Sequence, residues 1–198
     1  MITPSALQAE IAREKLGSNG KVYETKFEDF PESGPYDVCL FSESFQYVDL
    51  EHSLEKLKSI LAPGGRIIIA DCFRADAYAG DRQPGGGHRY SEFLEKIAAH
   101  GFVLVEDQDV TEAAAQSMAI DQNVYRGFVA PAVYQIIDLL RSKRPVLHWF
   151  ANLLYKIFVP KSERENIVAR LKADYRSPEA FVKVNTYRFL SLKRHNEA

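Results

Sequence analysis

The fold of this chain is decided by two stretches, Tyr36–Asp49 (YDVCLFSESFQYVD) and Leu61–Asp71 (LAPGGRIIIAD). Each contains a short apolar run, YDVCLF in the first and RIIIA in the second, and such runs are typical of parallel strands buried on both faces. Between them, Asp49 is placed to cap a helix in which leucine recurs at positions 50, 54, 57 and 61. Pro63-Gly64-Gly65 supplies a helix stop and the backbone freedom of a tight turn. The sequence therefore predicts a strand, a helix and a second strand.

Helices and strands alternate outward from this unit. Thr3-Pro4 is typical of a helix start, and apolar residues at positions 7, 11, 12 and 16 continue at helical spacing. Lys21–Thr25 is expected to form a short strand, Ser91 to cap a third helix, and Phe102–Gln108 to form a further strand. The order αβαβαβ predicts an α/β fold with a Rossmann-like, doubly wound and mainly parallel sheet.

The domain organisation follows from a change of character after residue 110. Residues 1–110 hold the alternating core, whereas residues 111–180 contain three expected helices, at about 121–143 (with Pro131 as a kink), 145–159 and 162–175. Residues 181–198 begin with a run rich in β-formers (FVKVNTYRFLSL), which is expected to return to the core as a final antiparallel strand. We therefore expect a helical insertion before the last strand.

Composition excludes several classes of protein. The 198 residues are 46% hydrophobic and 26% charged with a net charge of −2, which fits a soluble globular protein and gives no basic face for nucleic acid. Cys39 and Cys72 lie in apolar runs and are expected to be buried thiols, and no Cys/His cluster has metal-ligand spacing. The first residues lack the features of a signal peptide, and the apolar run Val146–Val159 is too short to span a bilayer. A cytoplasmic protein is expected.

The two deciding stretches, taken in order, resemble the fourth-strand and fifth-strand motifs of class I S-adenosylmethionine (SAM) methyltransferases. Upstream, TPSALQ (Thr3–Gln8) resembles the T-x-S-x-x-Q of the small-molecule subgroup, which includes cyclopropane-fatty-acid synthases, sterol methyltransferases and tocopherol methyltransferases. The resemblance implies SAM as the cofactor, with Thr3 and Gln8 at its ribose. Alternatively, Thr3 only caps a helix and Gln8 is solvated.

The segment KFEDF (Lys26–Phe30) resembles the G-W-E-E-F stretch of the cyclopropane-synthase relatives. The resemblance implies that Phe27 packs on the adenine and that Glu28 accepts a hydrogen bond from its amine. An apolar slab and an acceptor suit that base. The alternative is a core phenylalanine flanked by surface acids.

Polar residues follow the strand of the first deciding stretch, at the sheet edge where such folds bind ligands. Ser42 and Ser44 are expected to border the methionine part of SAM, and Glu43 is the best carboxylate for orienting or deprotonating a substrate. His88, after Gly85-Gly86-Gly87, is the best imidazole candidate for a base. A solvated acid and a surface histidine are the alternatives.

The glycine-rich loop that follows strand 1 in the family is absent, and Gly85-Gly86-Gly87 comes too late to replace it. The sequence therefore predicts a chain that starts near the end of strand 2, with the central strand missing from its sheet. Three explanations stay open: an N-terminally truncated fragment, a partner chain or second copy that completes the sheet, and a degenerate relative. In addition, Gln46 stands where cyclopropane synthases carry a glutamate that helps to hold bicarbonate, which disfavours cyclopropanation.

The functional prediction is methyl transfer from SAM to a small, fairly hydrophobic acceptor such as a lipid, quinol, polyketide or terpenoid. The acceptor class follows from the aromatic residues of the insertion. The insertion also carries ten Lys/Arg against seven Asp/Glu, which favours weak contact with a membrane surface. The rival hypothesis is a non-catalytic methyltransferase-like partner subunit or an inactive fragment.

Overall fold

The computed structural model describes residues 1–78, 87–172 and 177–195. They form two compact units. The described residues of the first unit fall in Met1–Ala79, Gly85–Val110 and Asn185–Ala198, and those of the second fall in Thr111–Val184. Apart from Gly87 and His88, the glycine-rich loop after the second deciding stretch lies outside the described residues.

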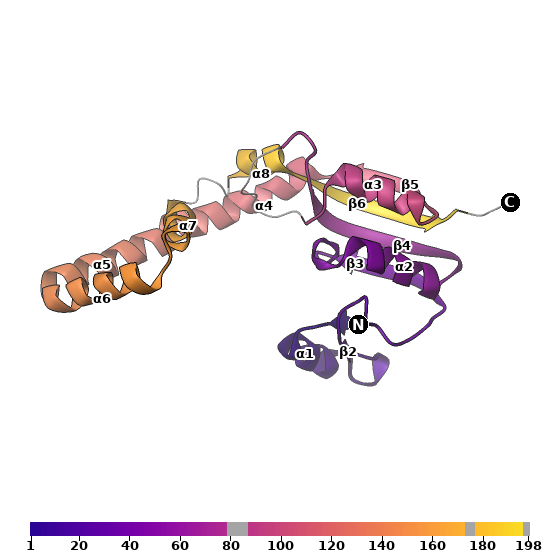
Figure 1. Cartoon of the computed structure of the whole chain (residues 1–198), viewed down its shortest axis with the longest axis horizontal. Coiled ribbons are helices and arrows are strands. Elements are labelled where there is room, and N and C mark those ends of the chain that lie inside the picture. Colours follow the sequence, from indigo (N-terminus) through magenta and orange to yellow (C-terminus); the bar gives the residue numbers. More distant parts are fainter. Residues whose placement is uncertain (79–86, 173–176, 196–198) are drawn as a thin grey trace. The chain divides into compact units, whose positions relative to one another are not determined.

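The first unit contains a four-stranded sheet (Figure 1). In sheet order its strands are β3 (Tyr36–Ser42), β4 (Leu61–Arg74), β6 (Asn185–Arg194) and β5 (Phe102–Asp109). β3 runs parallel to β4, and β6 runs antiparallel to both β4 and β5. The predicted Rossmann-like α/β fold is therefore confirmed.

A second, two-stranded sheet lies nearer the N-terminus. β1 (Ile2–Thr3) and β2 (Tyr23–Glu24) pair in parallel, and helix α1 (Ala6–Leu16) connects them through the 3₁₀ turn Gly17–Asn19. Among the described residues, β1 pairs only with β2 and β3 pairs only with β4. The strands of the first unit thus form two separate sheets.

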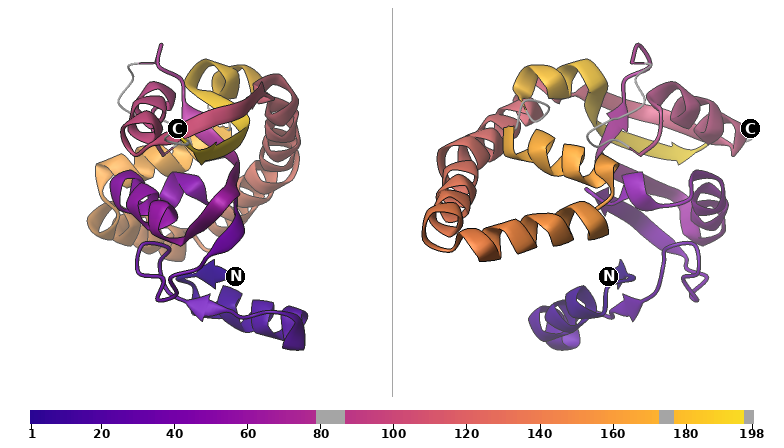
Figure 2. Two further views of the ribbon diagram at one scale, coloured as in Figure 1. Left: turned by 90° about the vertical axis from the view of Figure 1, so that its right-hand side faces the viewer. Right: turned by 60° about the vertical axis from the view of Figure 1, so that its left-hand side comes forward.

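Helix α2 (Leu50–Ile60) and helix α3 (Tyr90–Ala99) lie on the same side of the four-stranded sheet (Figure 2, left). Both pack against one apolar cluster. Its members on the helices and strands include Leu54, Leu57, Phe93, Ile97, Phe41, Ile67, Ile69, Leu190 and Leu192. The core of the unit therefore lies between the sheet and these two helices.

The expectation that the strands of the deciding stretches are buried on both faces was wrong. Ile67 and Ile69 of β4 are about 1% exposed, but Ile68 between them is 40% exposed. Val38 and Leu40 of β3 are also exposed. Successive side chains of a strand point to opposite faces, and α2 and α3 cover the same one.

Two predicted helix caps were also wrong. Ser5 caps α1, with its Oγ accepting from Gln8 N at 3.4 Å, because Thr3 lies in β1. α3 begins one residue before Ser91, whose hydroxyl donates instead to Asp76 Oδ1 at 2.7 Å. The prediction for α2 is confirmed, since Asp49 Oδ1 accepts from His52 N at 2.9 Å.

The second unit is helical. Its helices are α4 (Thr111–Val124), the π-helical turn Tyr125–Val129, α5 (Ala130–Lys143), α6 (Pro145–Phe158), α7 (Lys161–Lys172) and α8 (Pro178–Val184). The helix expected from residue 121 begins ten residues earlier, and the π-helical turn Tyr125–Val129 joins α4 directly to α5 just before Pro131, whose missing N–H interrupts the helical hydrogen bonds there. The strand expected from residue 181 begins at Asn185, because Ser177 and Pro178 start α8.

Candidate functional site

The first unit contains a cleft of about 1270 Å³ between its two sheets. Its lining includes the carboxyl ends of β1, β2 and β3 and the residues that follow them, which is where ligands bind in parallel α/β sheets, together with the rest of β3 and residues such as Lys21 and Ile60. Seven of the eight residues predicted for the site line this cleft. They are Thr3, Gln8, Phe27, Glu28, Ser42, Glu43 and Ser44.

Thr3 and Gln8 form one polar corner of the cleft. Thr3 is 4% exposed, and its Oγ1 donates to Gln8 Oε1 at 2.8 Å. Ser5 N donates back to Thr3 Oγ1 at 3.3 Å. Because the amide oxygen of Gln8 is occupied by Thr3, its amide nitrogen is left to donate to a ligand. Thr3 therefore orients Gln8 and does not cap the helix.

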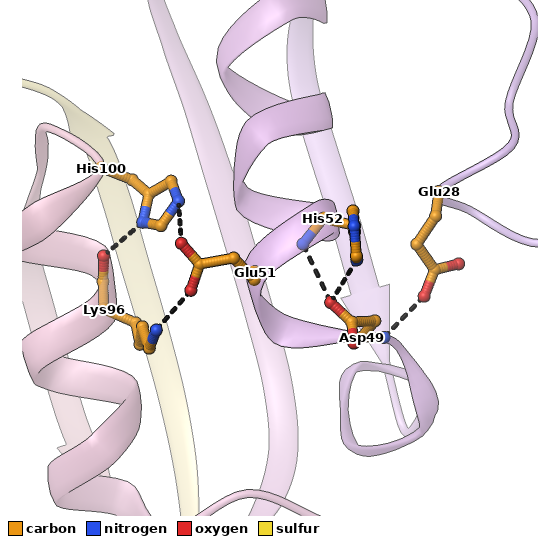
Figure 3. A network of polar contacts seen from close by, with 6 residues as sticks. All are labelled: Glu28, Asp49, Glu51, His52, Lys96 and His100. Atoms are coloured by element: carbon orange, nitrogen blue, oxygen red, sulfur yellow. Dashed lines mark hydrogen bonds and ion pairs between the residues drawn. The ribbon is translucent and has the colours of Figure 1, made fainter.

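Phe27 and Glu28 form an apolar and an acidic surface beside each other. The Phe27 ring meets the ring of Phe41 edge to face, with centroids 4.9 Å apart and an interplanar angle of 78°. Glu28 Oε1 accepts from Asp49 N at 2.6 Å (Figure 3), and the structure records no partner for the other oxygen among the described residues. The pair thus offers a ring and a carboxylate oxygen to a ligand.

The hydrogen bond between Asp49 N and Glu28 belongs to a wider set of polar contacts at the start of α2 (Figure 3). Asp49 Oδ1 lies 2.8 Å from His52 Nδ1, and hydrogen bonds from the His52 backbone and ring lower the pKa of Asp49. Glu51 pairs with Lys96 and, at 3.0 Å, with His100 Nε2. Since Lys96 and His100 belong to α3 and its cap, the network fixes α2 against α3 and so positions Glu28.

The residues after β3 form the opposite wall of the cleft. Glu43 has a φ of 52°, in the left-handed region that non-glycine residues adopt at a cost, often at ligand sites. Its backbone N–H donates to Ala70 O at 2.9 Å, and its carboxylate accepts from the Tyr187 hydroxyl. Burial, and then this hydrogen bond, raises the pKa of Tyr187. The Glu43 side chain is therefore held by strand β6.

Asp71 supports this wall from inside the protein. It has no exposed surface, and its carboxylate accepts from Phe45 N at 2.5 Å, Gln46 N at 3.2 Å and Cys72 N at 2.7 Å. Burial raises the pKa of Asp71, while these three hydrogen bonds oppose the shift. Asp71 does not line the cleft. Its hydrogen bonds with Phe45 N and Gln46 N instead hold the turn Phe45–Tyr47 in place.

His88 is the predicted site residue that the structure does not bring to the cleft. Its ring packs edge-on against the ring of Phe45, with centroids 5.9 Å apart, and its carbonyl accepts from Arg74 N at 2.8 Å. His88 Nε2 is buried and has no hydrogen-bond partner among the described residues. A side chain on the neighbouring Gly87 would place its Cβ 2.0 Å from Gln46 O, so the backbone packs tightly here.

Sequence reasoning missed a tyrosine–glutamate cluster at the other end of the cleft. The hydroxyls of Tyr23 and Tyr36 both donate to Glu32, and Lys21 Nζ lies 3.2 Å from Glu32 Oε1. The hydrogen bonds from the two tyrosines lower the pKa of Glu32 to about 2, and Glu32 raises the pKa of Tyr36 to about 12. No local signal marks these residues, because the contacts join separate loops.

The described part of the chain shows neither a disulfide nor a cluster of metal ligands. Cys39 and Cys72 are free thiols, and burial raises the pKa of Cys39 to about 11, so it stays protonated at neutral pH. The described residues contain no group of three potential metal ligands. Within the same residues, no helix has the length and apolar character needed to cross a membrane.

Comparison with known sequences finds a family match for the first third of the chain. Residues 1–69, which include every predicted site residue that lines the cleft, match a sequence family described as a methyltransferase domain. No curated protein sequence matches the chain.

Solved structures resemble nearly the whole chain at low sequence identity. The 4+2 cyclase SpnF is 19% identical, with a TM-score of 0.60 over 98% of this chain and 64% of its own. Geranyl diphosphate C-methyltransferase from Streptomyces coelicolor A3(2), solved with S-adenosyl-L-homocysteine, is 16% identical, with a TM-score of 0.61 over 98% of this chain and 63% of its own.

A third structure is the O-methyltransferase of a trans-AT polyketide synthase multienzyme of Brevibacillus brevis in complex with S-adenosyl-L-homocysteine. It is 18% identical, with a TM-score of 0.56 over 98% of this chain and 57% of its own. The chain spans less than two thirds of the length of these three proteins. At such identities the likeness establishes the fold alone, the Rossmann-like fold that these methyltransferases share with the cyclase.

Proposed function

We propose that the chain binds SAM in the cleft of the first unit and takes part in methyl transfer to a small, fairly hydrophobic acceptor. The observation that carries this proposal is that one cleft gathers seven residues from three separate segments of the chain, all predicted from the sequence to contact the cofactor or the substrate. The match of residues 1–69 to a methyltransferase domain and the bound S-adenosyl-L-homocysteine of two structural neighbours support it.

The residues present fit the chemistry of SAM. The half-buried ring of Phe27 suits the face of an adenine, and the second oxygen of Glu28 suits its amine. The amide nitrogen of Gln8, for which no partner is seen among the described residues, can donate to ribose hydroxyls. The hydroxyls of Ser42 and Ser44 border the remaining part of the cleft and suit the polar methionine end.

Bound SAM would supply a methyl group activated by a sulfonium centre. The chain's own task is then to align the acceptor and exclude water. Glu43 is the residue best placed to orient a hydroxyl or amine of the acceptor, or to take its proton. Tyr187 acts as a positioning residue, because its hydroxyl donates to the Glu43 carboxylate.

The acceptor is proposed to be a lipid, quinol, polyketide or terpenoid. The aromatic residues of the second unit support an apolar acceptor, and the printed names of two structural neighbours mention geranyl diphosphate and a polyketide synthase. We place the chain with the small-molecule subgroup of cyclopropane, sterol and tocopherol relatives. Gln46 in place of a glutamate argues against cyclopropanation within that subgroup.

A second candidate function is a non-catalytic methyltransferase-like subunit that needs a partner chain or a second copy. The open edges of β1 and β3 favour it, because both strands border the cleft and neither has a second strand partner among the described residues. The structural likeness to a cyclase also shows that this fold is not confined to methyl transfer.

Calorimetric titration of the whole chain with S-adenosyl-L-homocysteine tests the proposal. Phe27→Ala is expected to weaken binding by about fivefold to tenfold, because an aromatic contact contributes roughly 1 kcal/mol beyond burial. Phe150→Ala is the matched control, since Phe150 lies in the second unit and does not line the cleft. Equal affinity of the Phe27 variant and the wild type would remove the adenine assignment.

Glu28→Gln sharpens the same test. Glutamine retains an oxygen that can accept from Asp49 N, but its second polar atom is a donor that cannot accept from an amine. We expect weaker binding of the adenosine ligand with little change in the melting temperature. A loss of stability without a loss of affinity would show that Glu28 serves only the loop.

A further inference from the structure

Helix α6 (Figure 1) belongs to the second unit. It has no buried residue, although most of its side chains are apolar. Eight large apolar side chains are each between 38% and 79% exposed. They are Val146, Leu147, Trp149, Phe150, Leu153, Leu154, Ile157 and Phe158. A soluble protein rarely leaves so large an apolar surface without an interaction partner.

The polar residues of α6 occupy a narrow stripe. His148, Asn152 and Lys156 recur every fourth residue and therefore share one side of the helix, which leaves the apolar residues on the rest of its circumference. This division into one apolar and one polar side is typical of helices that lie in the plane of a membrane interface.

α5 and α6 form a helical hairpin, hereafter residues 130–158, whose connection is the single residue Arg144. Exposed apolar side chains continue on α5 at Ile136, Ile137 and Leu139. The two helices contact each other and still leave these side chains exposed. The apolar surface therefore belongs to the hairpin as a whole.

Positive charge is concentrated on the same hairpin. Residues 130–158 carry Arg141, Lys143, Arg144 and Lys156 against Asp138 alone, a net charge of +3, whereas the whole chain carries −2. Three of these cations lie together at the hairpin turn. The rest of the chain is therefore acidic. The net positive charge of the hairpin lies beside the exposed apolar surface.

We infer that the hairpin 130–158 docks on the surface of an anionic lipid bilayer, with the apolar side of α6 in the interface and the cations at the phosphate groups. Trp149 and Tyr155 are residues that membrane interfaces favour, and long Lys and Arg side chains can reach headgroups from a helix at that depth. The helices are too short to cross the bilayer, which fits binding at the surface.

The positive charge of the hairpin favours an anionic lipid surface over a second copy of the chain as its partner. A face carrying +3 would repel the same face of another copy, whereas an anionic surface attracts it. The inference concerns the second unit alone and does not depend on the cofactor or on the proposed methyl transfer.

Trp149 gives a direct test, because it is the single tryptophan of the chain and is 63% exposed. Its fluorescence is measured on the full chain with vesicles of phosphatidylcholine, alone or with about 30% phosphatidylglycerol. We expect a blue shift and quenching by brominated lipid with the anionic vesicles, a weaker response with the neutral ones, and loss of the response in high salt.

Variants assign the response to the hairpin. Substituting Arg141, Lys143 and Arg144 together with glutamine is expected to weaken binding to anionic vesicles by at least about tenfold, since each cation near a charged membrane contributes measurably. Ile157→Glu is expected to weaken it similarly. Ile120→Glu is the matched control, because Ile120 is 69% exposed in the same unit but lies outside the hairpin.

Three outcomes overturn the inference. Trp149 emission that stays unchanged with anionic vesicles excludes docking through α6. Emission that is already blue-shifted in buffer, and that sedimentation velocity traces to a monomer, shows that the protein itself covers the hairpin. Blue-shifted emission in a dimer that ignores vesicles shows that a second copy covers it.

Discussion

The core of the first unit and the hairpin 130–158 of the second use the same apolar residue types but treat them in opposite ways. Leu57 and Phe93 are fully buried between the sheet and its helices, whereas Leu147 and Phe150 of α6 are more than half exposed. In the first unit the apolar side chains are buried because alternate residues of the strands point to one face of the sheet, and α2 and α3 both cover that face. In the hairpin, two amphipathic helices contact each other and leave most of their apolar side chains exposed. An apolar pattern therefore predicts an element but does not reveal what covers it.

The largest expected contrast between the two regions is in stability. Leu57→Ala should lower the free energy of unfolding by roughly 2–5 kcal/mol, because it leaves a cavity in a closed core. Leu147→Ala, the same change at a residue 55% exposed, should stay within about 0.5 kcal/mol. Chemical denaturation of both variants measures the contrast. Equal losses would mean that α6 is packed in solution.

A smaller effect is expected at the polar support of the cleft. Asp71→Ala leaves the backbone N–H groups of Phe45 and Cys72 without their acceptor in a buried place, which should cost roughly 1–3 kcal/mol. Asp138→Ala, an exposed carboxylate on α5, is the control with little expected change. An unaltered unfolding curve for Asp71→Ala would show that the turn Phe45–Tyr47 does not depend on this carboxylate.

The contact between Glu43 and Tyr187 should contribute about 1 kcal/mol, as one hydrogen bond to an exposed carboxylate does. A double-mutant cycle with Glu43→Gln and Tyr187→Phe isolates that interaction from the effects of each change alone. Strict additivity of the two changes would indicate that the contact does not form in solution, and Tyr187 would then have no role in positioning Glu43.

A further effect is expected at Glu32 and depends on pH. Its pKa in the folded chain is about 2, below the ordinary value of 4.5, so its ionised form stabilises the fold above pH 4.5. That contribution is lost as the pH falls from about 4.5 to about 2. The stability difference between the wild type and Glu32→Gln should therefore shrink across this window in acid denaturation. A constant difference would contradict the hydrogen bonds from Tyr23 and Tyr36.

Short-range sequence patterns predicted much of the fold. Leucine spacing, the Asp49 cap and Pro63-Gly64-Gly65 predicted β3, α2 and β4 in the right order, because helix periodicity and turn chemistry act over a few residues. The same kind of signal failed at Phe181–Val184. There the β-branched composition favoured a strand, but Ser177 Oγ accepts from Ala180 N and Pro178 opens a helix.

Contacts between distant residues could not be predicted. The register that brings Tyr187 to Glu43 depends on strand pairing across most of the chain, and the Glu32 cluster joins loops with no shared pattern. The exposure of Val38 and Leu40 depends on which face α2 and α3 cover. By contrast, the sequence could predict that Thr3, Phe27 and Ser42 line one cleft, because each lies at or just after the carboxyl end of a parallel strand.

The central claim is that the loops after β1, β2 and β3 form a single nucleoside-binding cleft. Titrating isotope-labelled chain with S-adenosyl-L-homocysteine, followed by backbone NMR, tests it most directly. We predict that the amide signals of Thr3, Phe27 and Ser42 shift together and give one dissociation constant, while those of α6 do not move. Absence of shifts at saturating ligand, or shifts confined to one of the three loops, would contradict the claim.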